Sequence, residues 1–88
     1  MYYTYILRSL KNNKYYIGYT SNLEKRLEEH NSGRVSFTKC HIPWELYCFE
    51  KFEDIKKAIQ RERQIKSWKS RAMIEKLKFK IEDPRPRL

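Results

Sequence analysis

The sequence predicts a single α/β domain of the α+β type, with three strands and about three helices. Three stretches are rich in aromatic and β-branched residues, which is the composition of strands. Three other stretches repeat apolar residues at the spacing of a helix. Because 88 residues have room for one hydrophobic core, we expect one domain over residues 1–82. Residues 83–88 are then expected to form a short, basic tail that contains proline.

The first two strands are expected to form an antiparallel hairpin. Residues 2–9 and 14–20 have strand composition, and the turn-forming residues 10–13 lie between them. Side chains alternate between the two faces of a strand. One face of the first strand therefore carries Tyr3, Tyr5 and Leu7, and one face of the second carries Tyr16, Gly18 and Thr20. A glycine inside a strand usually marks a close approach by a backbone or a ligand, so we expect one at Gly18.

A helix should follow from about residue 22. Ser21 and Glu24 fit a capping box, in which both side chains satisfy free amide groups at the helix start. Gly33 can adopt the left-handed conformation that closes a helix. At about 100° per residue, four residues fall within one arc, and they are Leu23, Arg26, Leu27 and His30. The arginine and the histidine are therefore expected on the side of the helix that faces the sheet.

The second half of the chain predicts a loop, a strand and two helices. Residues 34–43 have no sustained period and are expected to form a loop, whereas residues 44–52 are typical of a strand. A helix is expected from residue 55 to about residue 68, with an N-cap at residues 53 and 54. Ser67 or Ser70 should precede a third helix, whose apolar stripe is Met73, Ile74, Leu77 and Ile81.

Glu62 interrupts the apolar side of the helix over residues 55–68. The arc that contains it is otherwise formed by Ile55, Ala58, Ile59 and Ile65. Burial of an unpaired carboxylate costs several kcal/mol, so this side chain needs a cation, a hydrogen-bonding network or a metal ion. An ion pair with Arg26 or Lys66 is the purely structural alternative.

The charge balance indicates a polyanionic partner. The chain has 20 lysine and arginine residues against 11 aspartate and glutamate residues, a formal charge of +9. A basic surface neutralises phosphates and releases counterions, so nucleic acid is the leading partner, although a merely well-solvated surface is the alternative. The candidates for phosphate contacts are Lys39, Lys56, Arg61, Arg63, Lys66 and Lys69.

Membrane and secreted classes are disfavoured by the same composition. No apolar run approaches the roughly 18 residues of a membrane span, and no signal-peptide pattern follows Met1, so we expect a soluble cytoplasmic protein. Cys40 and Cys48 could form one disulfide, but reduced thiols are the favoured reading. Together with two histidines they could also suggest zinc, although no paired C-x-x-C spacing is present.

The order of these residues resembles the GIY-YIG nuclease superfamily, and especially its small stand-alone members. These are related to the N-terminal nuclease domain of the bacterial excision-repair incision protein. The second tripeptide of the family is literal at Tyr16-Ile17-Gly18, while Tyr3-Thr4-Tyr5 stands at the place of the first. Arg26 lies ten residues after Tyr16, His30 lies one turn further, and Glu62 matches the family's metal-binding glutamate.

The resemblance implies a GIY-YIG fold, a three-stranded antiparallel sheet flanked by helices, and hydrolysis of phosphodiester bonds with one divalent metal ion, Mg²⁺ or Mn²⁺. Glu62 would bind this ion. Tyr16 would take a proton from the attacking water, directly or through a neighbour, and Tyr5 would position the water or share the proton. Arg26 would hold the nonbridging oxygens, and His30 would relay a proton or hold a phosphate.

We therefore expect a metal-dependent endonuclease that acts on DNA, either directed by the structure of its substrate or weakly specific. DNA repair is one of several pathways that would fit. Two alternatives stay open, a non-catalytic nucleic-acid-binding module and a nuclease that acts on RNA. Specificity would come from the protein's own basic surface or from a protein partner.

Overall fold

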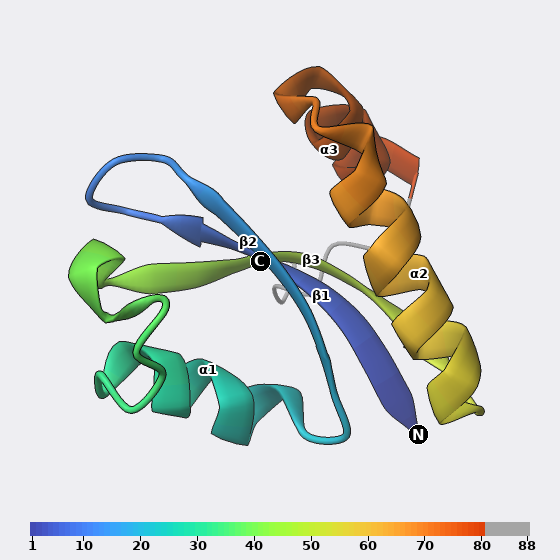
Figure 1. Cartoon of the computed structure of the whole chain (residues 1–88), viewed down its shortest axis with the longest axis horizontal. Coiled ribbons are helices and arrows are strands. Elements are labelled where there is room, and N and C mark those ends of the chain that lie inside the picture. Colours follow the sequence, from blue (N-terminus) through green and yellow to red (C-terminus); the bar gives the residue numbers. More distant parts are fainter. Residues whose placement is uncertain (81–88) are drawn as a thin grey trace, which may run out of the picture.

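The predicted hairpin forms one side of a three-stranded antiparallel sheet (Figure 1). The computed structural model describes residues 1–80. Strand β1 (Tyr2–Ser9) lies in the centre, between β2 (Tyr15–Thr20) and β3 (Trp44–Phe52). In the β1–β2 register, Tyr5 is opposite Gly18 and Leu7 is opposite Tyr16. The three-stranded antiparallel sheet implied by the sequence is confirmed, and β2 is one of its two edges.

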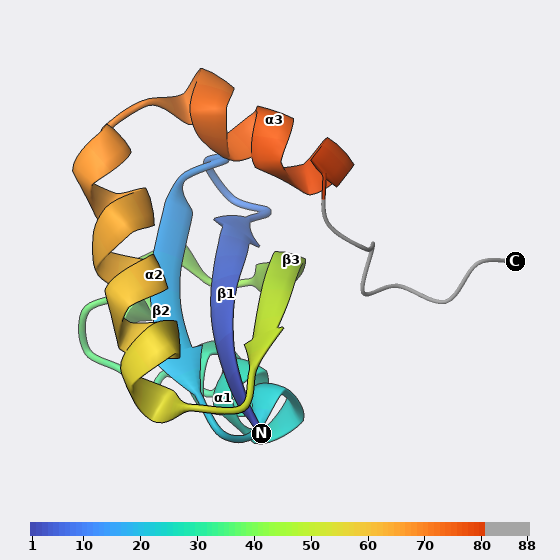
Figure 2. The same cartoon turned by 90° about the vertical axis from the view of Figure 1, so that its right-hand side faces the viewer.

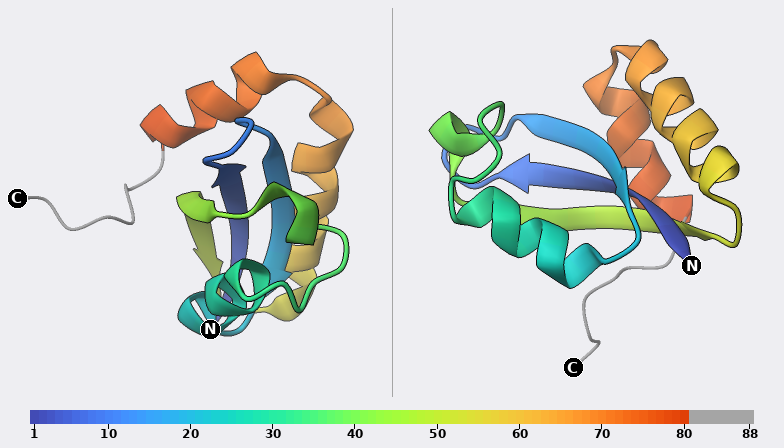
Figure 3. Two further views of the ribbon diagram at one scale, coloured as in Figure 1. Left: turned by 90° about the vertical axis from the view of Figure 1, so that its left-hand side faces the viewer. Right: turned by 60° about the horizontal axis from the view of Figure 1, so that its bottom comes forward.

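Helices cover both faces of this sheet. Helix α1 (Leu23–Asn31) packs on one face, and α2 (Ile55–Trp68) and α3 (Arg71–Lys80) pack on the other (Figures 2 and 3). Because β1 is central, its residues 4–7 are buried on both faces. The α1 side is packed with Tyr5, Leu7 and Trp44, and the other side with Ile6, Tyr47, Cys48, Ile65, Ile74 and Leu77.

Helix α1 begins one residue later than the capping box predicts. Asn22 is the N-cap, with an extended backbone, and its side chain accepts a hydrogen bond from the Lys25 amide at 3.1 Å. The predicted cap at Ser21 is therefore wrong. The Thr20 hydroxyl accepts a hydrogen bond from the Asn22 amide at 3.1 Å, and this contact fixes Asn22 at the junction between β2 and α1. The predicted left-handed Gly33 is confirmed, with a φ of 80°.

The predicted helices of the second half are present, but two of their apolar residues face solvent. Ile55 is 41% exposed and Met73 is 43% exposed, so their predicted places in the packed stripes are wrong. Ile55 is the first residue of α2 and Met73 lies in the first turn of α3, where the neighbouring elements do not cover them. The loop before β3 contains one 3₁₀ turn, η1 (Lys39–His41).

The expectations for Ile81 and for the tail over residues 83–88 lie outside the described residues. Within residues 1–80, no helix has the length and apolar character that crossing a membrane requires. Cys40 is an exposed free thiol, whereas Cys48 lies in the core.

Candidate active site

Tyr5 lies across Gly18 at the centre of the site. Its ring is 2% exposed, and a Cβ atom on Gly18 would lie 2.5 Å from Tyr5 Oη and 2.7 Å from Tyr5 Cζ. A close approach to Gly18 is therefore present, but it is made by the Tyr5 phenol of the neighbouring strand and not by a backbone or a ligand as predicted. The glycine of the second tripeptide is required because any side chain there would displace this ring.

A chain of hydrogen bonds runs from α1 through Tyr5 into the loop before β3. Arg26 Nε donates to Tyr5 Oη at 3.3 Å, and Tyr5 Oη lies 3.0 Å from His30 Nε2. His30 Nδ1 lies 2.7 Å from Thr38 Oγ1, and the Thr38 hydroxyl donates to the Val35 carbonyl at 3.3 Å. Since threonine has a single hydroxyl hydrogen, His30 Nδ1 must carry the proton that Thr38 accepts. His30 Nε2 is then the acceptor of the Tyr5 hydroxyl.

Burial keeps both members of this pair neutral. His30 is 0% exposed, and burial, followed by the charge of Arg26, lowers its pKa to about 4, against a smaller opposing effect of Glu29. Burial likewise raises the pKa of Tyr5 to about 12, although the hydrogen bond from Arg26 opposes that shift. A neutral imidazole is the form that can accept the Tyr5 hydroxyl, so the pKa values agree with the hydrogen-bond directions.

Tyr16 lies beside this pair but has a different environment. Its ring packs against His30 and Tyr5, with centroids 5.0 Å and 6.4 Å away. The side chain is only half-buried, and within the described part of the chain no hydrogen bond engages its hydroxyl. Tyr5 thus uses its hydroxyl inside the protein, whereas the Tyr16 hydroxyl is available to water.

Glu62 approaches the same centre from the other face of the sheet. Its side chain is 13% exposed and forms an ion pair with Lys66, at 3.2 Å between Glu62 Oε1 and Lys66 Nζ. Of the two partners that the sequence suggested, Lys66 is therefore the one that pairs. Glu62 is also among the charges that raise the pKa of Tyr5, after burial and Tyr16. Tyr5, Tyr16, Arg26 and His30 thus lie together on the α1 side of the sheet, while Glu62 comes from α2, the helix on the other face.

Comparison with known proteins shows the family of the chain. The family model described as "GIY-YIG catalytic domain" matches residues 1–78. The chain belongs to the GIY-YIG family.

Several relatives of this GIY-YIG protein carry the name UPF0213 protein. One from Syntrophus aciditrophicus is 40% identical over 84 residues, which cover 93% of this chain and 92% of that relative. One from Natronomonas pharaonis is 42% identical over 76 residues, covering 85% and 87%. The solution NMR structure of a UPF0213 protein from Bacillus halodurans matches with a TM-score of 0.57 and 30% identity, over 96% of this chain and 89% of that chain. Membership of the GIY-YIG family supports a nuclease function.

The basic residues that the sequence singled out do not form one surface in the GIY-YIG protein. Arg61 is engaged within the fold, because its Nε donates to Glu50 Oε1 at 2.6 Å and its guanidinium lies 5.3 Å from the Trp68 ring centre. Lys39 lies in η1, on the far side of the site from α2. Exposed positions on α2 and at its end are occupied by Lys56, Arg63, Lys66 and Lys69.

Two residues of the loop before β3 have positions that the sequence did not predict. Thr38 is 1% exposed and orients His30, as described above. Phe37 is 82% exposed, and its ring centre lies 6.4 Å from that of Tyr16. The loop has no hydrophobic period, so no pattern in the sequence distinguishes the buried threonine from the exposed phenylalanine.

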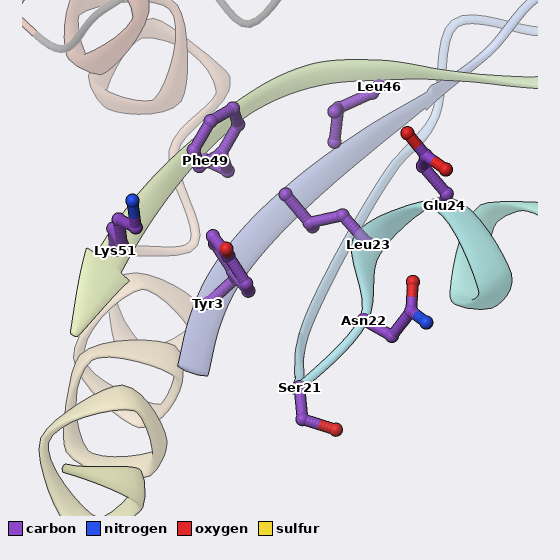
Figure 4. A pocket seen from close by; sticks show the side chains of 8 residues that line it. All are labelled: Tyr3, Ser21, Asn22, Leu23, Glu24, Leu46, Phe49 and Lys51. Atoms are coloured by element: carbon purple, nitrogen blue, oxygen red, sulfur yellow. The ribbon is translucent and has the colours of Figure 1, made fainter. Parts of the chain in front are cut away.

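A hollow of about 440 Å³ lies next to the site without containing it (Figure 4). It is between the start of α1 and the β1–β3 pair, with Tyr3, Leu23, Leu46 and Phe49 among its lining residues. None of the predicted catalytic or metal-binding residues lines it. The hollow lacks the groups that phosphodiester chemistry needs, so its size does not identify it as the active site.

Lowering the pH from 7 to 4.5 should reduce the free energy of unfolding by about 2 kcal/mol through His30 alone. The unfolded chain binds a proton at this histidine below about pH 6.5, whereas the folded protein binds it only near pH 4. The unfolded state therefore gains protons first, and stability falls as the pH falls through this window. Urea denaturation of the wild type and of His30→Gln, each at pH 7 and pH 4.5, would isolate the contribution of His30 to this loss of stability.

Imidazole NMR shifts provide a measurement that does not depend on a variant, since the His30 ring should stay neutral down to about pH 5. Titration of His30 near pH 6.5 would contradict the buried, neutral assignment.

Proposed function

We propose that the protein is a divalent-metal-dependent endonuclease that hydrolyses phosphodiester bonds in DNA. The protein would select its substrate by structure, or with little specificity of its own. A protein partner would be a further source of specificity. The observation that carries the proposal is the unequal use of two neighbouring tyrosine hydroxyls. Tyr5 is held between Arg26 and His30, whereas Tyr16 presents its hydroxyl to water beside the same groups.

Tyr16 is suited to take the proton of the attacking water. A phenol must first lose its own proton to act as a base, and a nearby positive charge favours that loss. The pKa of Arg26 is raised, chiefly by its hydrogen bond with Tyr5, and the charge of Tyr16 contributes to the shift. The guanidinium therefore lies close enough to Tyr16 for the two side chains to interact electrostatically.

Arg26 is suited to hold the phosphate on which the water acts. Its side chain is 34% exposed, with Nε donating to Tyr5 and Nη1 lying 3.4 Å from Glu29 Oε1. These contacts fix the plane of the guanidinium and leave N–H groups for the nonbridging oxygens. Negative charge that develops on those oxygens is then met by donors that are already oriented.

The surroundings of Glu62 fit a hard divalent cation. Its carboxylate is nearly buried, and its ion-pair partner Lys66 is half exposed, so the pair can open at little cost. Within the described residues, no group of three His, Cys, Asp or Glu side chains is placed to hold a metal ion. One carboxylate with waters and phosphate oxygens is a set that Mg²⁺ or Mn²⁺ accepts and that a zinc site does not use. When bound, such an ion would polarise the scissile phosphate and stabilise the leaving oxygen.

Tyr5 and His30 are best described as positioning residues. His30 is completely buried, so it acts on the reaction through Tyr5, whose hydroxyl it accepts. Tyr5 in turn accepts from Arg26 and packs against Tyr16. This pair thereby sets the distance between the arginine and the second tyrosine, which are the two groups proposed to meet the substrate.

The proposal is tested by incubating the protein with plasmid, single-stranded and branched DNA and with matched RNA, in Mg²⁺, Mn²⁺ or chelator. Cleavage of DNA that requires either metal and stops in chelator would support it. Faster cleavage of the matched RNA would replace DNA by RNA as the substrate. Tight binding of all these nucleic acids without cleavage in either metal would instead establish the non-catalytic binding module.

A further inference from the structure

A second hollow, of about 270 Å³, lies between the start of β2 and the junction of α2 and α3. Figure 2 shows this junction beside the end of the hairpin. The residues that line the hollow include no aspartate or glutamate. Its basic lining residues are Lys14, Lys66, Lys69 and Arg71. The lining therefore concentrates positive charge and contains no acid, although two of its cations pair with acids outside it, Lys66 with Glu62 and Arg71 with Glu75.

Two of these four cations are available for a ligand. Within residues 1–77, no ion pair and no hydrogen bond engages the ammonium group of Lys14 or of Lys69. Arg71, by contrast, donates to the Asn13 carbonyl at 2.7 Å and lies 4.6 Å from the Tyr15 ring centre. Arg71 thus forms a fixed wall that holds the hairpin turn against α3, and the two lysines stand free beside it.

The backbone at Lys69 adds a second observation. Lys69 has φ 50° and ψ 34°, the left-handed conformation in which a helix usually ends on glycine. A residue with a Cβ atom is strained there. The lysine side chain lines the hollow from this position, so a glycine would relieve the strain but remove one of the two free charges.

Helix α2 links the hollow to Glu62, because Lys66, which lines the hollow, pairs with Glu62. Glu62 and Lys66 are four residues apart and lie on one side of the helix, and Lys69 is the C-cap that directly follows its last residue. Seven residues of α-helix rise by about 10 Å, which is on the order of three nucleotides along a duplex. A strand whose phosphate is bound beside Glu62 can therefore reach the free lysines.

We propose that this hollow binds a backbone phosphate of the nucleic-acid strand that flanks the scissile bond. The inference rests on the proposed function only in taking the same strand as occupant. Lys14 and Lys69 would contact the phosphate, Arg71 would shape the wall, and Lys66 would stand between this subsite and Glu62. Binding there would hold the strand in register with the catalytic centre, independently of base sequence.

The test is the salt dependence of DNA binding in chelator, measured by fluorescence anisotropy. Lys14→Gln/Lys69→Gln should reduce the magnitude of the slope of log K against log[salt] by about 1.8, or about 0.9 for each lost contact. Affinity at 50 mM salt should fall by roughly tenfold for each lysine. Lys51→Gln/Lys57→Gln removes the same charge from exposed residues outside the hollow and should leave the slope within about 0.5 of the wild type.

Lys69→Gly separates a ligand contact from a structural role. Its melting temperature should rise by about 4 °C as strain is relieved, while its DNA affinity falls as for Lys69→Gln. An unchanged slope in the double variant, or an equal loss in the control pair, would overturn the subsite. Because no metal is present, failure of the nuclease assay leaves this result readable. A reduced slope in a protein that never cuts would place the subsite in a binding module.

A separate observation concerns Phe37. Its neighbour Thr38 is anchored, since the Thr38 hydroxyl contacts His30 and its carbonyl accepts Trp44 Nε1 at 3.0 Å. Phe37 therefore projects from a fixed turn, although 82% of it is exposed. An exposed phenylalanine on its own needs no explanation, but this one lies beside the ring of Tyr16, whose hydroxyl is proposed to activate water.

We infer that Phe37 stacks on an unpaired base next to the scissile phosphate. The proposed substrate would then be nucleic acid with an unstacked base at the cleavage site, such as a single strand or a branch. Phe37→Ala should weaken binding of a single strand by about 5- to 100-fold and binding of a fully paired duplex by less. Phe37→Trp should restore the single-strand affinity.

Fluorescence of 2-aminopurine in the single strand reports stacking directly, and it should be quenched by the wild type but not by Phe37→Ala. Met73→Ala is the control, because it removes another exposed apolar side chain, far from Tyr16 on α3. Equal affinity of Phe37→Ala and wild type for the single strand would overturn the inference, whether or not the protein cleaves DNA.

Discussion

Glu62→Gln should abolish cleavage while leaving binding of DNA intact. The amide keeps the shape of the side chain but lacks the charge that would hold a divalent cation. A metal ion contributes several kcal/mol to stabilising charge in the transition state, so we expect the rate of cleavage to fall by about 10³-fold or more. Titration calorimetry with Mn²⁺ should show that the variant has lost metal binding. Affinity for DNA in chelator should stay the same or rise, because a negative charge has been removed.

Glu28→Gln is the matched control. Glu28 is an exposed acid on α1, so this variant should cut DNA and bind Mn²⁺ as the wild type does. Thermal unfolding of Glu62→Gln should change little, because the Glu62–Lys66 pair is an i,i+4 contact with a half-exposed lysine. Cleavage by Glu62→Gln at the wild-type rate would remove Glu62 from the mechanism.

Tyr16→Phe should reduce the rate of cleavage by about 10²- to 10⁴-fold with little effect on stability. The substitution removes one hydroxyl, and within the described residues that hydroxyl has no hydrogen-bond partner to lose. The ring contacts with His30 and Tyr5 remain. Single-turnover cleavage in Mg²⁺ and urea denaturation, measured on the same preparation, would show the loss of rate beside the unchanged stability.

Tyr5→Phe provides the contrasting variant, since it removes a hydroxyl that is fully used. His30 Nε2 would lose its donor inside the core, which should cost about 1–3 kcal/mol of unfolding free energy. The two variants are therefore distinguished by the quantity that each lowers, which is the rate of cleavage for Tyr16→Phe and the free energy of unfolding for Tyr5→Phe. A Tyr16→Phe variant that loses as much stability as Tyr5→Phe, or that cuts at the wild-type rate, would contradict the roles assigned here.

The bounds of most elements could be predicted because they depend on local pattern. The strand over residues 2–9, the strand over residues 44–52 and the helix over residues 55–68 all form as expected. The errors occurred at the ends of elements, where contacts with neighbouring residues decide which residue caps a helix and which is buried. Asn22 and Ser21 are both good N-caps, and only the neighbouring Thr20 selects Asn22. Ile55 belongs to an apolar arc, but the start of α2 is not covered by the sheet.

The candidate site likewise has features that could be predicted from the sequence and features that could not. Resemblance to the GIY-YIG family was enough to nominate Tyr5, Tyr16, Arg26, His30 and Glu62, because the motif is a matter of residue types and spacing. Which tyrosine is buried against the histidine does not follow from that motif. It depends on Tyr5 and His30 meeting over a separation of 25 residues, at the place where Gly18 leaves space.

By itself, the sequence determined the α+β class, the order of the elements, the excess of positive charge and the residue types of the site. Only the tertiary structure decided that Tyr5 is locked while Tyr16 is free, that Glu62 pairs with Lys66, and that free lysines share a hollow. The physical reason is the distance along the chain over which each kind of interaction acts. Secondary structure follows from propensity and period within a few residues, whereas a hydrogen bond or an ion pair depends on distances between side chains far apart in the chain.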